Sequence, residues 1–222
     1  MSIRTKDLFD LSMTLAGPLL ESEEYPWLVL PKIRDFILEI GPKLPNEIYK
    51  RTSENVWIAQ SAKIHKNAEL CGPAIIGPNT ELRTGAYIRG NVIIGEGCVI
   101  GNSCEIKNSI IFNNAQVPHF NYIGDSILGY KAHTGAGAIT SNVKSDKSLV
   151  KVRFEGNVIE TGLKKFGAII GDGVEVGCNS VLNPGTVIGR NSNIYPLSMV
   201  RGYVPPNCIY KSKNDIVLKN NN

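Results

Sequence analysis

Three histidines are the side chains of this 222-residue sequence best suited to acid–base chemistry near neutral pH: His65, His119 and His133. His119 stands apart, because the aromatic residues Phe120 and Tyr122 follow it and because a regular sequence pattern breaks beside it. His119 is therefore either a general base or a loop histidine with no catalytic role, and we expect His65 and His133 to lie on the surface. A metal site needs several converging ligands, and nothing in the sequence gathers three histidines, so we expect none.

The elements that must position these side chains follow a period of six. Large apolar residues recur at every sixth position from Ile58 to Phe112, and a mostly small residue lies four positions after each. Helices repeat at 3.6 residues and simple strands at 2, so this period fits neither. It is typical of a hexapeptide β-helix, in which three hexads form one coil and the strands of successive coils stack about 4.8 Å apart.

The phase of this pattern breaks after Val117 and resumes in a shifted register at Leu128. We expect residues 118–127 to bulge out of the prism, and such departures from local regularity are where functional sites are expected. A second excursion is predicted at residues 143–167. There Val150–Glu160 has the pattern of a β-hairpin.

The second excursion is basic, with lysines at positions 144, 147, 151, 164 and 165. It is either a solvated charged loop or an arm that offers cations to phosphates on a neighbouring subunit. Hexads return from Ile170, and Pro205-Pro206 ends the prism because proline cannot donate to a strand ladder.

Residues 1–54 do not repeat, and we predict that they form a helical N-terminal cap. Pro31–Ile40 reads as a short helix, which Gly41-Pro42 ends. This cap is expected to cover the open end of the first coil, with a docking surface or substrate lid as the alternative. The prism is predicted to span residues 55–206 and a C-terminal tail residues 207–222.

The amino-acid composition limits the classes of molecule that this chain could bind. The net charge of +4 is too small to indicate nucleic-acid binding, but it is compatible with an anionic small molecule. The five cysteines contain no CxxC pair, and Cys98 and Cys104 fall at inward hexad positions, where small buried residues are expected. We expect no disulfides, no signal peptide, no membrane span and a cytoplasmic location.

The run HFNYIGDSILGYKAHTGAGAITSN, residues 119–142, resembles the acetyltransferase domain of the bifunctional N-acetylglucosamine-1-phosphate uridylyltransferases, where it reads close to HLTYLGDAxIGxxVNIGAGTITCN. Residues 82–86, LRTGA, are similar to that family's LRPGA, and residues 105–108, EIKN, to its VEMKK segment. Residues 150–190 are closer to the archaeal sugar-1-phosphate nucleotidylyl/acetyltransferases, which share the inserted hairpin. The resemblance implies an all-β fold, a left-handed parallel β-helix of hexapeptide repeats with a short N-terminal helical segment.

The resemblance also implies an activity, transfer of an acetyl group from acetyl-CoA to the nitrogen of an amino-sugar 1-phosphate, glucosamine-1-phosphate or galactosamine-1-phosphate. A homotrimer with sites between adjacent prisms is implied as well. The roles that it implies are general base for His119, phosphate binding for Arg83 and Lys107, sugar binding for Tyr122 and Asn142, a further phosphate contact for Lys151, and contacts with the acetyl-CoA cosubstrate for Ala168 and Ser180.

Two departures from the family pattern keep alternatives open. His133 stands where the family has an asparagine, and this change could mark a different acceptor. Residues 1–50 are too short for a nucleotidylyltransferase domain and contain no glycine-rich phosphate loop, so nucleotidylyl transfer is not expected. The alternatives are an acyltransferase with another acceptor and a non-catalytic scaffold or regulatory subunit.

Overall fold

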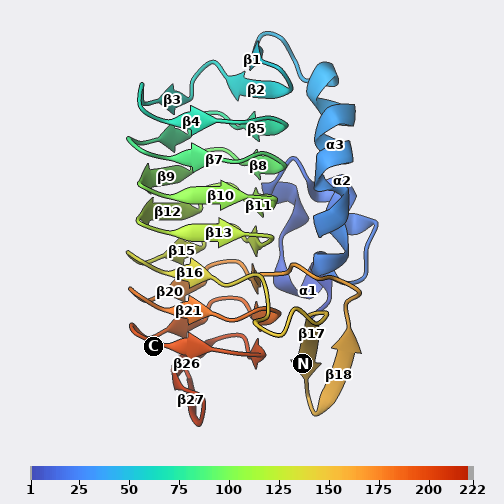
Figure 1. Ribbon diagram of the computed structural model, residues 1–222, viewed down its shortest axis with the longest axis vertical. Coiled ribbons are helices and arrows are strands. Elements are labelled where there is room, and N and C mark those ends of the chain that lie inside the picture. The colour runs from blue at the N-terminus through green and yellow to red at the C-terminus, as the bar shows by residue number, and fades with distance from the viewer. Residues whose placement is uncertain (1, 220–222) are drawn as a thin grey trace.

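The computed structural model describes residues 2–219, which form a β-solenoid of short strands stacked in parallel coils (Figure 1). Each coil contributes one strand to each of three sheets, here named A, B and C. The stacked neighbours run parallel, apart from one antiparallel pair at an end of sheet A and one at an end of sheet B. The predicted parallel β-helix is confirmed.

The strands of each sheet stack in the order of the coils. Sheet A contains β1 (Tyr49–Ser53), β2 (Val56–Ala59), β5 (Ala74–Ile76), β8 (Val92–Ile94), β11 (Ser109–Ile111), β14 (Ile127–Leu128), β19 (Ala168–Ile170), β22 (Thr186–Ile188) and β25 (Tyr203–Val204). Sheet B contains β3 (Lys63–Ile64), β6 (Glu81–Leu82), β9 (Val99–Asn102), β12 (Gln116–His119), β15 (His133–Thr134), β20 (Glu175–Val176), β23 (Asn193–Ile194), β26 (Cys208–Ser212) and β27 (Asp215–Leu218). Sheet C contains β4 (Glu69–Leu70), β7 (Tyr87–Ile88), β10 (Glu105–Lys107), β13 (Tyr122–Gly124), β16 (Ile139–Thr140), β21 (Val181–Leu182) and β24 (Met199–Val200).

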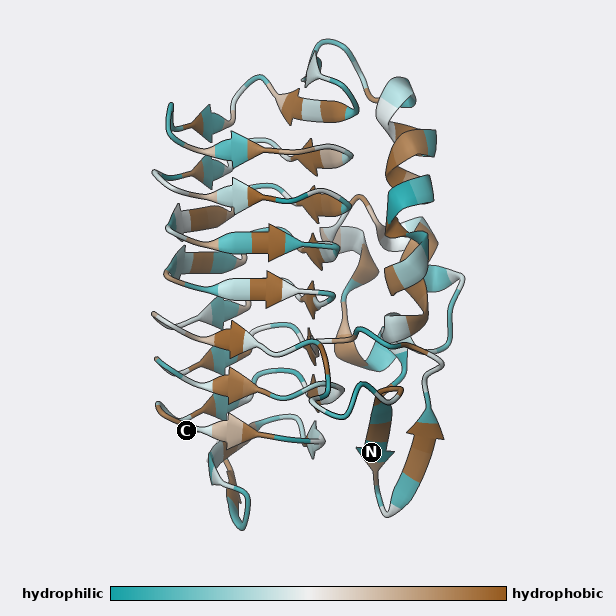
Figure 2. Cartoon of the chain, in the orientation of Figure 1, coloured by the Kyte–Doolittle hydropathy of each residue, from teal (hydrophilic) through white to brown (hydrophobic). Residues whose placement is uncertain are grey.

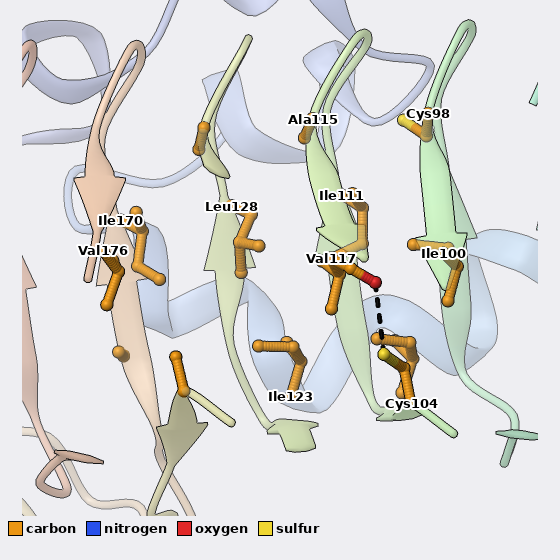
Figure 3. Packing of buried hydrophobic residues seen from close by; sticks show 14 of the residues in the cluster. Cys98, Ile100, Cys104, Ile111, Ala115, Val117, Ile123, Leu128, Ile170 and Val176 are labelled. Atoms are coloured by element: carbon orange, nitrogen blue, oxygen red, sulfur yellow. Dashed lines mark hydrogen bonds between the residues drawn. The ribbon is translucent and has the colours of Figure 1, made fainter. Parts of the chain in front are cut away.

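A column of apolar side chains fills the interior of the prism (Figure 3). Ile100, Val117 and Ile123 belong to this column, and the Cys104 thiol donates to the Val117 carbonyl at 3.2 Å. Cys98 and Cys104 are buried within it, as the hexad positions predict. Burial raises the pKa of the Cys98 thiol to about 12, so this cysteine behaves as a small apolar residue.

The change of hexad phase occurs one coil earlier than the sequence suggested. Ile106 is followed inside the prism by Ile111, five positions on, whereas Phe112 points outward and packs on Phe9 at 4.9 Å between ring centroids. The next coil is contracted by one residue at the same corner, between Ile123 and Leu128. The bulge predicted at residues 118–127 is therefore wrong: those residues form β12, β13 and β14 in the ordinary ladder.

The N-terminal segment lies along sheet A instead of over the end of the first coil (Figure 1). The reason is a second apolar row: Ile75, Ile93 and Ile110 point outward from successive strands of sheet A and pack against the helices. Covering this row removes apolar area from water, which is the main stabilising term in folding. The helical elements are α1 (Thr5–Leu8), η1 (Leu11–Met13), α2 (Gly17–Glu21), η2 (Pro26–Lys32), α3 (Ile33–Ile40) and η3 (Gly41–Lys43), where η marks a 3₁₀-helix.

The end of the first coil is covered by β1, which pairs antiparallel with β2. At the other end of the prism β27 pairs antiparallel with β26. The predicted second excursion contains the hairpin of β17 (Lys151–Phe154) and β18 (Asn157–Glu160), which lies beside the last coils. No helix within residues 2–219 is long and apolar enough to cross a membrane.

Candidate active site on sheet C

Asp125 connects several of the predicted site residues at the corner where sheet C leads into sheet A. Its side chain is only 6 % exposed, and its Oδ2 accepts hydrogen bonds from Lys107 Nζ at 3.2 Å and from Asn142 Nδ2 at 2.5 Å. Its Oδ1 accepts from Asn108 Nδ2 at 2.9 Å. A buried carboxylate with this many donors is held in one orientation and fixes the groups that donate to it.

The contracted corner explains why these residues meet. Lys107 pairs with Gly124 in the ladder between β10 and β13, so Asn108 lies beside Asp125 in the next coil. Both residues have positive φ, 46° for Asn108 and 48° for Asp125, a conformation that Asn and Asp tolerate better than other residues with a side chain. Asn108 also donates to the Leu30 carbonyl of η2 at 3.3 Å, which ties the N-terminal segment to the site.

Tyr122 lies on the outer face of sheet C next to this cluster. Its hydroxyl accepts a hydrogen bond from Asn142 Nδ2 at 3.2 Å. Its side chain extends over Gly124, because a Cβ at Gly124 would lie 2.4 Å from that hydroxyl. Burial, and after it the negative charges of Asp125 and Glu105, raise the pKa of Tyr122, so its phenol is neutral at physiological pH.

The structure does not bring Arg83 to Lys107. Arg83 follows β6 on sheet B, and its guanidinium forms an ion pair with Glu81 at 3.2 Å, whereas Lys107 is on sheet C. The predicted pairing of these two cations on one phosphate therefore fails within the chain.

Arg89 is the cation that sequence reasoning missed. It follows β7, and the pairing of Tyr87 with Glu105 places Arg89 beside Lys107 on sheet C. Its guanidinium lies 5.9 Å from the centre of the Tyr87 ring and forms an ion pair with Glu105. The signal was present in the spacing, since Arg89 precedes Lys107 by one full coil of eighteen residues and Arg83 does not.

His119 ends β12 at the corner between sheets B and C, three positions before Tyr122. Its imidazole is exposed and has no hydrogen bond or ion pair with any residue in the described range 2–219. Its backbone is fixed: the N–H donates to Asn121 Oδ1 at 3.0 Å and the carbonyl accepts from Gly137 N at 3.0 Å. Asn121 itself is buried and donates to the Gly135 and Ala138 carbonyls at 2.8 and 3.1 Å. This corner therefore presents a free imidazole from a rigid backbone.

Three other predicted site residues lie elsewhere. Lys151 is on β17 of the hairpin and forms an ion pair with Glu160 at 2.6 Å. Ala168 and Ser180 are completely buried, Ala168 in the interior column and Ser180 with its Oγ donating to the Tyr195 carbonyl at 3.0 Å. Their side chains are closed to a ligand, so the predicted contacts with the cosubstrate at these two positions would have to come from backbone atoms.

His133, which replaces the asparagine of the resembling family, lies on the outer face of sheet B. It pairs with Gln116 on one side and Glu175 on the other, and its Nδ1 lies 2.7 Å from Glu175 Oε2. The carboxylate orients the ring and leaves Nε2 pointing away from this contact. The residue is half-buried, so the predicted surface position holds in part.

Comparisons with known proteins agree with this architecture. Residues 52–161 match the family model of the GMPPB C-terminal domain, and residues 167–202 match the bacterial transferase hexapeptide model of six repeats. The bifunctional protein GlmU of Methanococcus vannielii is 34 % identical over 205 residues, which cover 89 % of this chain and 48 % of that protein. The bifunctional sugar-1-phosphate nucleotidylyltransferase/acetyltransferase of Sulfurisphaera tokodaii is 37 % identical over 173 residues, 69 % of this chain and 43 % of that protein.

Among solved structures, the acetyltransferase domain of PglB from Neisseria gonorrhoeae, in complex with acetyl coenzyme A, is 14 % identical with a TM-score of 0.38 and covers 83 % of this chain and 64 % of that one.

The fold and the repeat match define the class of this chain as that of the hexapeptide-repeat proteins. Within that class it is a relative of the acetyltransferase region of the GlmU-type bifunctional proteins. The chain spans about half the length of the curated relatives that it matches.

Proposed function

We propose that this chain transfers the acetyl group of acetyl-CoA to the amino nitrogen of an amino-sugar 1-phosphate, glucosamine-1-phosphate or galactosamine-1-phosphate. The observation that carries the proposal is the cluster around Asp125, which holds Lys107, Asn142 and, through Asn142, Tyr122 on one face of sheet C. One cation, one amide and one phenol so arranged suit a phosphorylated sugar. Acetyltransferase appears in the name of the relative from Sulfurisphaera tokodaii, which supports the reaction class.

In this proposal the phosphate is bound by Lys107 and by Arg89, whose planar guanidinium can form two parallel hydrogen bonds to phosphate oxygens. Arg89 would have to exchange its ion pair with Glu105 for this contact. Tyr122 and Asn142 orient the sugar ring through hydroxyl and amide hydrogen bonds.

His119 acts as the general base. It removes a proton from the amine as the nitrogen attacks the thioester carbon, so that a C–N bond forms and the carbonyl electron pair moves to oxygen. When the carbonyl re-forms, the C–S bond breaks and CoA leaves as a thiolate that takes up the proton from His119. The free imidazole at the end of β12 suits this role, because no hydrogen bond must be broken before it reacts.

The proposal is tested by following thiol release from acetyl-CoA with glucosamine-1-phosphate, galactosamine-1-phosphate and the same amino sugars without phosphate. Turnover that requires the 1-phosphate supports the proposal. CoA binding without turnover on any amino sugar would favour another acceptor. In that case the replacement of the family asparagine by His133 would be the sequence difference that accompanies the change of acceptor. Neither binding nor turnover would favour a scaffold or regulatory subunit.

The residue assignment has its own test. His119→Ala is expected to lower kcat by about 10²–10⁴-fold, the usual cost of losing a general base. The melting temperature should not change, because the imidazole is exposed and forms no hydrogen bond or ion pair with a described residue. Exposed Phe120→Ala at the same corner is the matched control. Equal activity of His119→Ala and the wild type would reject the role of His119.

A further inference from the structure

A basic cavity, which includes Lys151, lies between the last coils of the prism and the β17–β18 hairpin. Its volume is about 390 Å³, and its cations are Lys144, Lys151, Arg153 and Arg201. Ser141, which precedes Asn142 of the candidate active site, forms part of its wall. The cavity therefore adjoins the proposed sugar site without sharing its phosphate-binding cations.

The four cations of this cavity differ in whether they form ion pairs. Lys144 pairs with Asp146 at 3.4 Å and Lys151 pairs with Glu160 at 2.6 Å. Arg153 and Arg201 have no hydrogen bond or ion pair with any described residue. Two guanidiniums that line one cavity repel each other, and an anion placed between them would remove that repulsion. The planar fork of arginine is suited to phosphate oxygens in particular.

A second cavity, of about 810 Å³, continues from the first and shares Arg153, Arg201 and Gly202 with it. The remainder of its wall is largely apolar and aromatic. Phe154 and Tyr203 pack edge to face with ring centroids 4.9 Å apart. The Tyr203 hydroxyl is buried without a hydrogen-bond partner among residues 2–219, so it is the ring of Tyr203 that this residue contributes to the wall.

We propose that the two cavities form one binding site for a phosphorylated nucleotide, with the phosphates between Arg153 and Arg201 and the planar base against Phe154 and Tyr203. Each half of the site is chemically selective. Guanidiniums bind phosphate oxygens in the first cavity, and an aromatic wall stacks any nucleobase in the second. The shared arginines lie where the phosphates join the nucleoside.

Two sources could supply this chemistry, the 3′-phosphorylated adenosine end of an acyl-CoA and a free nucleoside diphosphate. The first source rests on the proposed function, because it places the cosubstrate's nucleotide in these cavities and its thioester toward Asn142. The second does not need acyl transfer. The nucleotide chemistry is common to both.

The test uses isothermal titration of the whole chain with CoA, 3′,5′-ADP, 3′-dephospho-CoA, UDP and pyrophosphate. Arg153→Gln and Arg201→Gln are each expected to weaken 3′,5′-ADP about tenfold, the effect of losing one charge-assisted hydrogen-bonding group. Arg34→Gln is the matched control. Arg34 is exposed on α3 and lines neither cavity, so this variant should bind 3′,5′-ADP like the wild type.

A further variant tests the aromatic half. Phe154→Leu keeps an apolar side chain and removes the ring, so it should weaken 3′,5′-ADP about fivefold and leave pyrophosphate unchanged. Absence of binding by every nucleotide would overturn the proposal. So would nucleotide affinities that neither arginine variant changes, or pyrophosphate binding as tightly as the nucleotides.

Competition identifies the source. Displacement of 3′,5′-ADP by acetyl-CoA, with weaker binding of 3′-dephospho-CoA, would support the cosubstrate's nucleotide. UDP binding that depends on Arg153 and Arg201 but does not compete with acetyl-CoA would support a free nucleotide. Arginine-dependent nucleotide binding in a chain with no acetyltransferase turnover would leave this site established and would count against the proposed function alone.

Discussion

At the scale of single residues, Asp125 determines the geometry of the candidate active site more than any residue that would touch a substrate. It binds Lys107 and Asn142 through one oxygen and Asn108 through the other. Nothing in the local sequence distinguishes it from an aspartate that merely forms a turn after Gly124. Its role depends on the contracted corner, which brings donors from the two neighbouring coils to one point.

Asp125→Asn tests that role. The amide replaces one acceptor oxygen with a donor that faces either Asn108 or the pair Lys107 and Asn142, so at least one buried hydrogen bond is lost. We expect the free energy of unfolding to fall by about 2 kcal/mol, the cost of losing hydrogen bonds to a charged group. The KM for the sugar phosphate should rise about tenfold with a smaller change in kcat, because a substrate contact is displaced and the general base is not.

The measurements are urea unfolding and steady-state kinetics on the same preparation, with exposed Asp35→Asn on α3 as the matched control. Asp125→Glu should recover part of the KM effect, since it restores the charge at a slightly altered position. A merely structural aspartate would change the unfolding free energy and leave KM as it was, and that outcome would contradict the positioning role.

Tyr203 gives a prediction about pH. Burial, and after it the charge of Glu155, raises its pKa to about 12, and its buried hydroxyl has no described partner. The folded pKa lies above the unfolded value near 10, so the stability that Tyr203 contributes is fully present below pH 10 and is lost as the pH rises toward 12. Tyr203→Phe removes this dependence, because phenylalanine does not titrate.

The difference in unfolding free energy between Tyr203→Phe and the wild type should therefore be constant up to about pH 10 and grow in favour of the variant above it. At neutral pH the variant should be as stable as the wild type or slightly more stable, since it loses an unpaired buried hydroxyl. Denaturant unfolding at several pH values measures the difference, in which the other tyrosines cancel. A constant difference through pH 12 would show that the Tyr203 hydroxyl is solvated.

At the scale of elements, the N-terminal segment supports the site as well as covering sheet A. Trp27 of η2 is fully buried, and its ring lies 5.8 Å from that of Phe166. The backbone N–H of Phe166 donates to the Asn142 carbonyl at 2.9 Å, while the Leu30 carbonyl accepts from Asn108. Two contacts from one short helix thus reach the two asparagines that hold Asp125.

Trp27→Ala should lower the free energy of unfolding by about 3–5 kcal/mol, the range for removing a large aromatic side chain from a packed core. If the N-terminal segment and the prism fold as one unit, the urea unfolding curve of the variant should still show a single cooperative transition. Trp27→Phe, which keeps an aromatic ring between Tyr25 and Phe166, is the control and should lose less. A Trp27→Ala variant as stable as the wild type in urea would mean that the segment packs only loosely on sheet A.

The sequence allowed the prism to be predicted because a hexad is local: each anchor and its small partner are four residues apart, and their period is visible without any knowledge of contacts. The single-residue contraction between Ile106 and Ile111 was invisible for the opposite reason. Ile110, Ile111 and Phe112 are all large and apolar, so the pattern alone cannot show which of them points inward. Only the packing of Phe112 on Phe9, more than a hundred residues away, decides it.

The difference between local pattern and long-range packing also explains which site residues were predicted correctly. His119, Lys107, Tyr122 and Asn142 were found by motif and lie on or beside sheet C, whereas Arg83 was chosen by motif and lies on sheet B. Coil spacing would have selected Arg89 instead. The position of the N-terminal segment could not be predicted from its own residues, because the apolar row that binds it belongs to the outward positions of sheet A.

At the scale of the whole molecule, the three faces of the prism differ in what covers them. Sheet A is covered by the N-terminal segment, so sheets B and C remain as the open faces. Along sheet C one row of outward residues runs from Tyr122 through Ile139 and Val181 to Met199. Figure 2 shows the apolar, brown colouring of β16 and β21, whereas β4 at the far end of sheet C begins in hydrophilic teal. The candidate site thus lies at one end of an exposed apolar row.

We expect this row to be the contact between chains in the proposed homotrimer, which would place residues of a neighbouring chain next to Tyr122. Met199 is 68 % exposed and Leu197, at the adjacent corner, is 80 % exposed, so a charge at either position should not disturb the fold of a single chain. In the assembly the same charge would be buried against apolar surface, which is strongly unfavourable.

Met199→Glu and Leu197→Asp should therefore reduce the mass measured by light scattering from three times the 24.2 kDa of one chain to the mass of one chain. Leu218→Glu, equally exposed on β27 and outside the row, should leave the trimer intact. The circular dichroism spectra of all three variants should match the wild type, and acetyl transfer should fall only in the two that dissociate. A wild-type chain that is already monomeric, or dissociated variants with full activity, would show that the site on sheet C is complete within one prism.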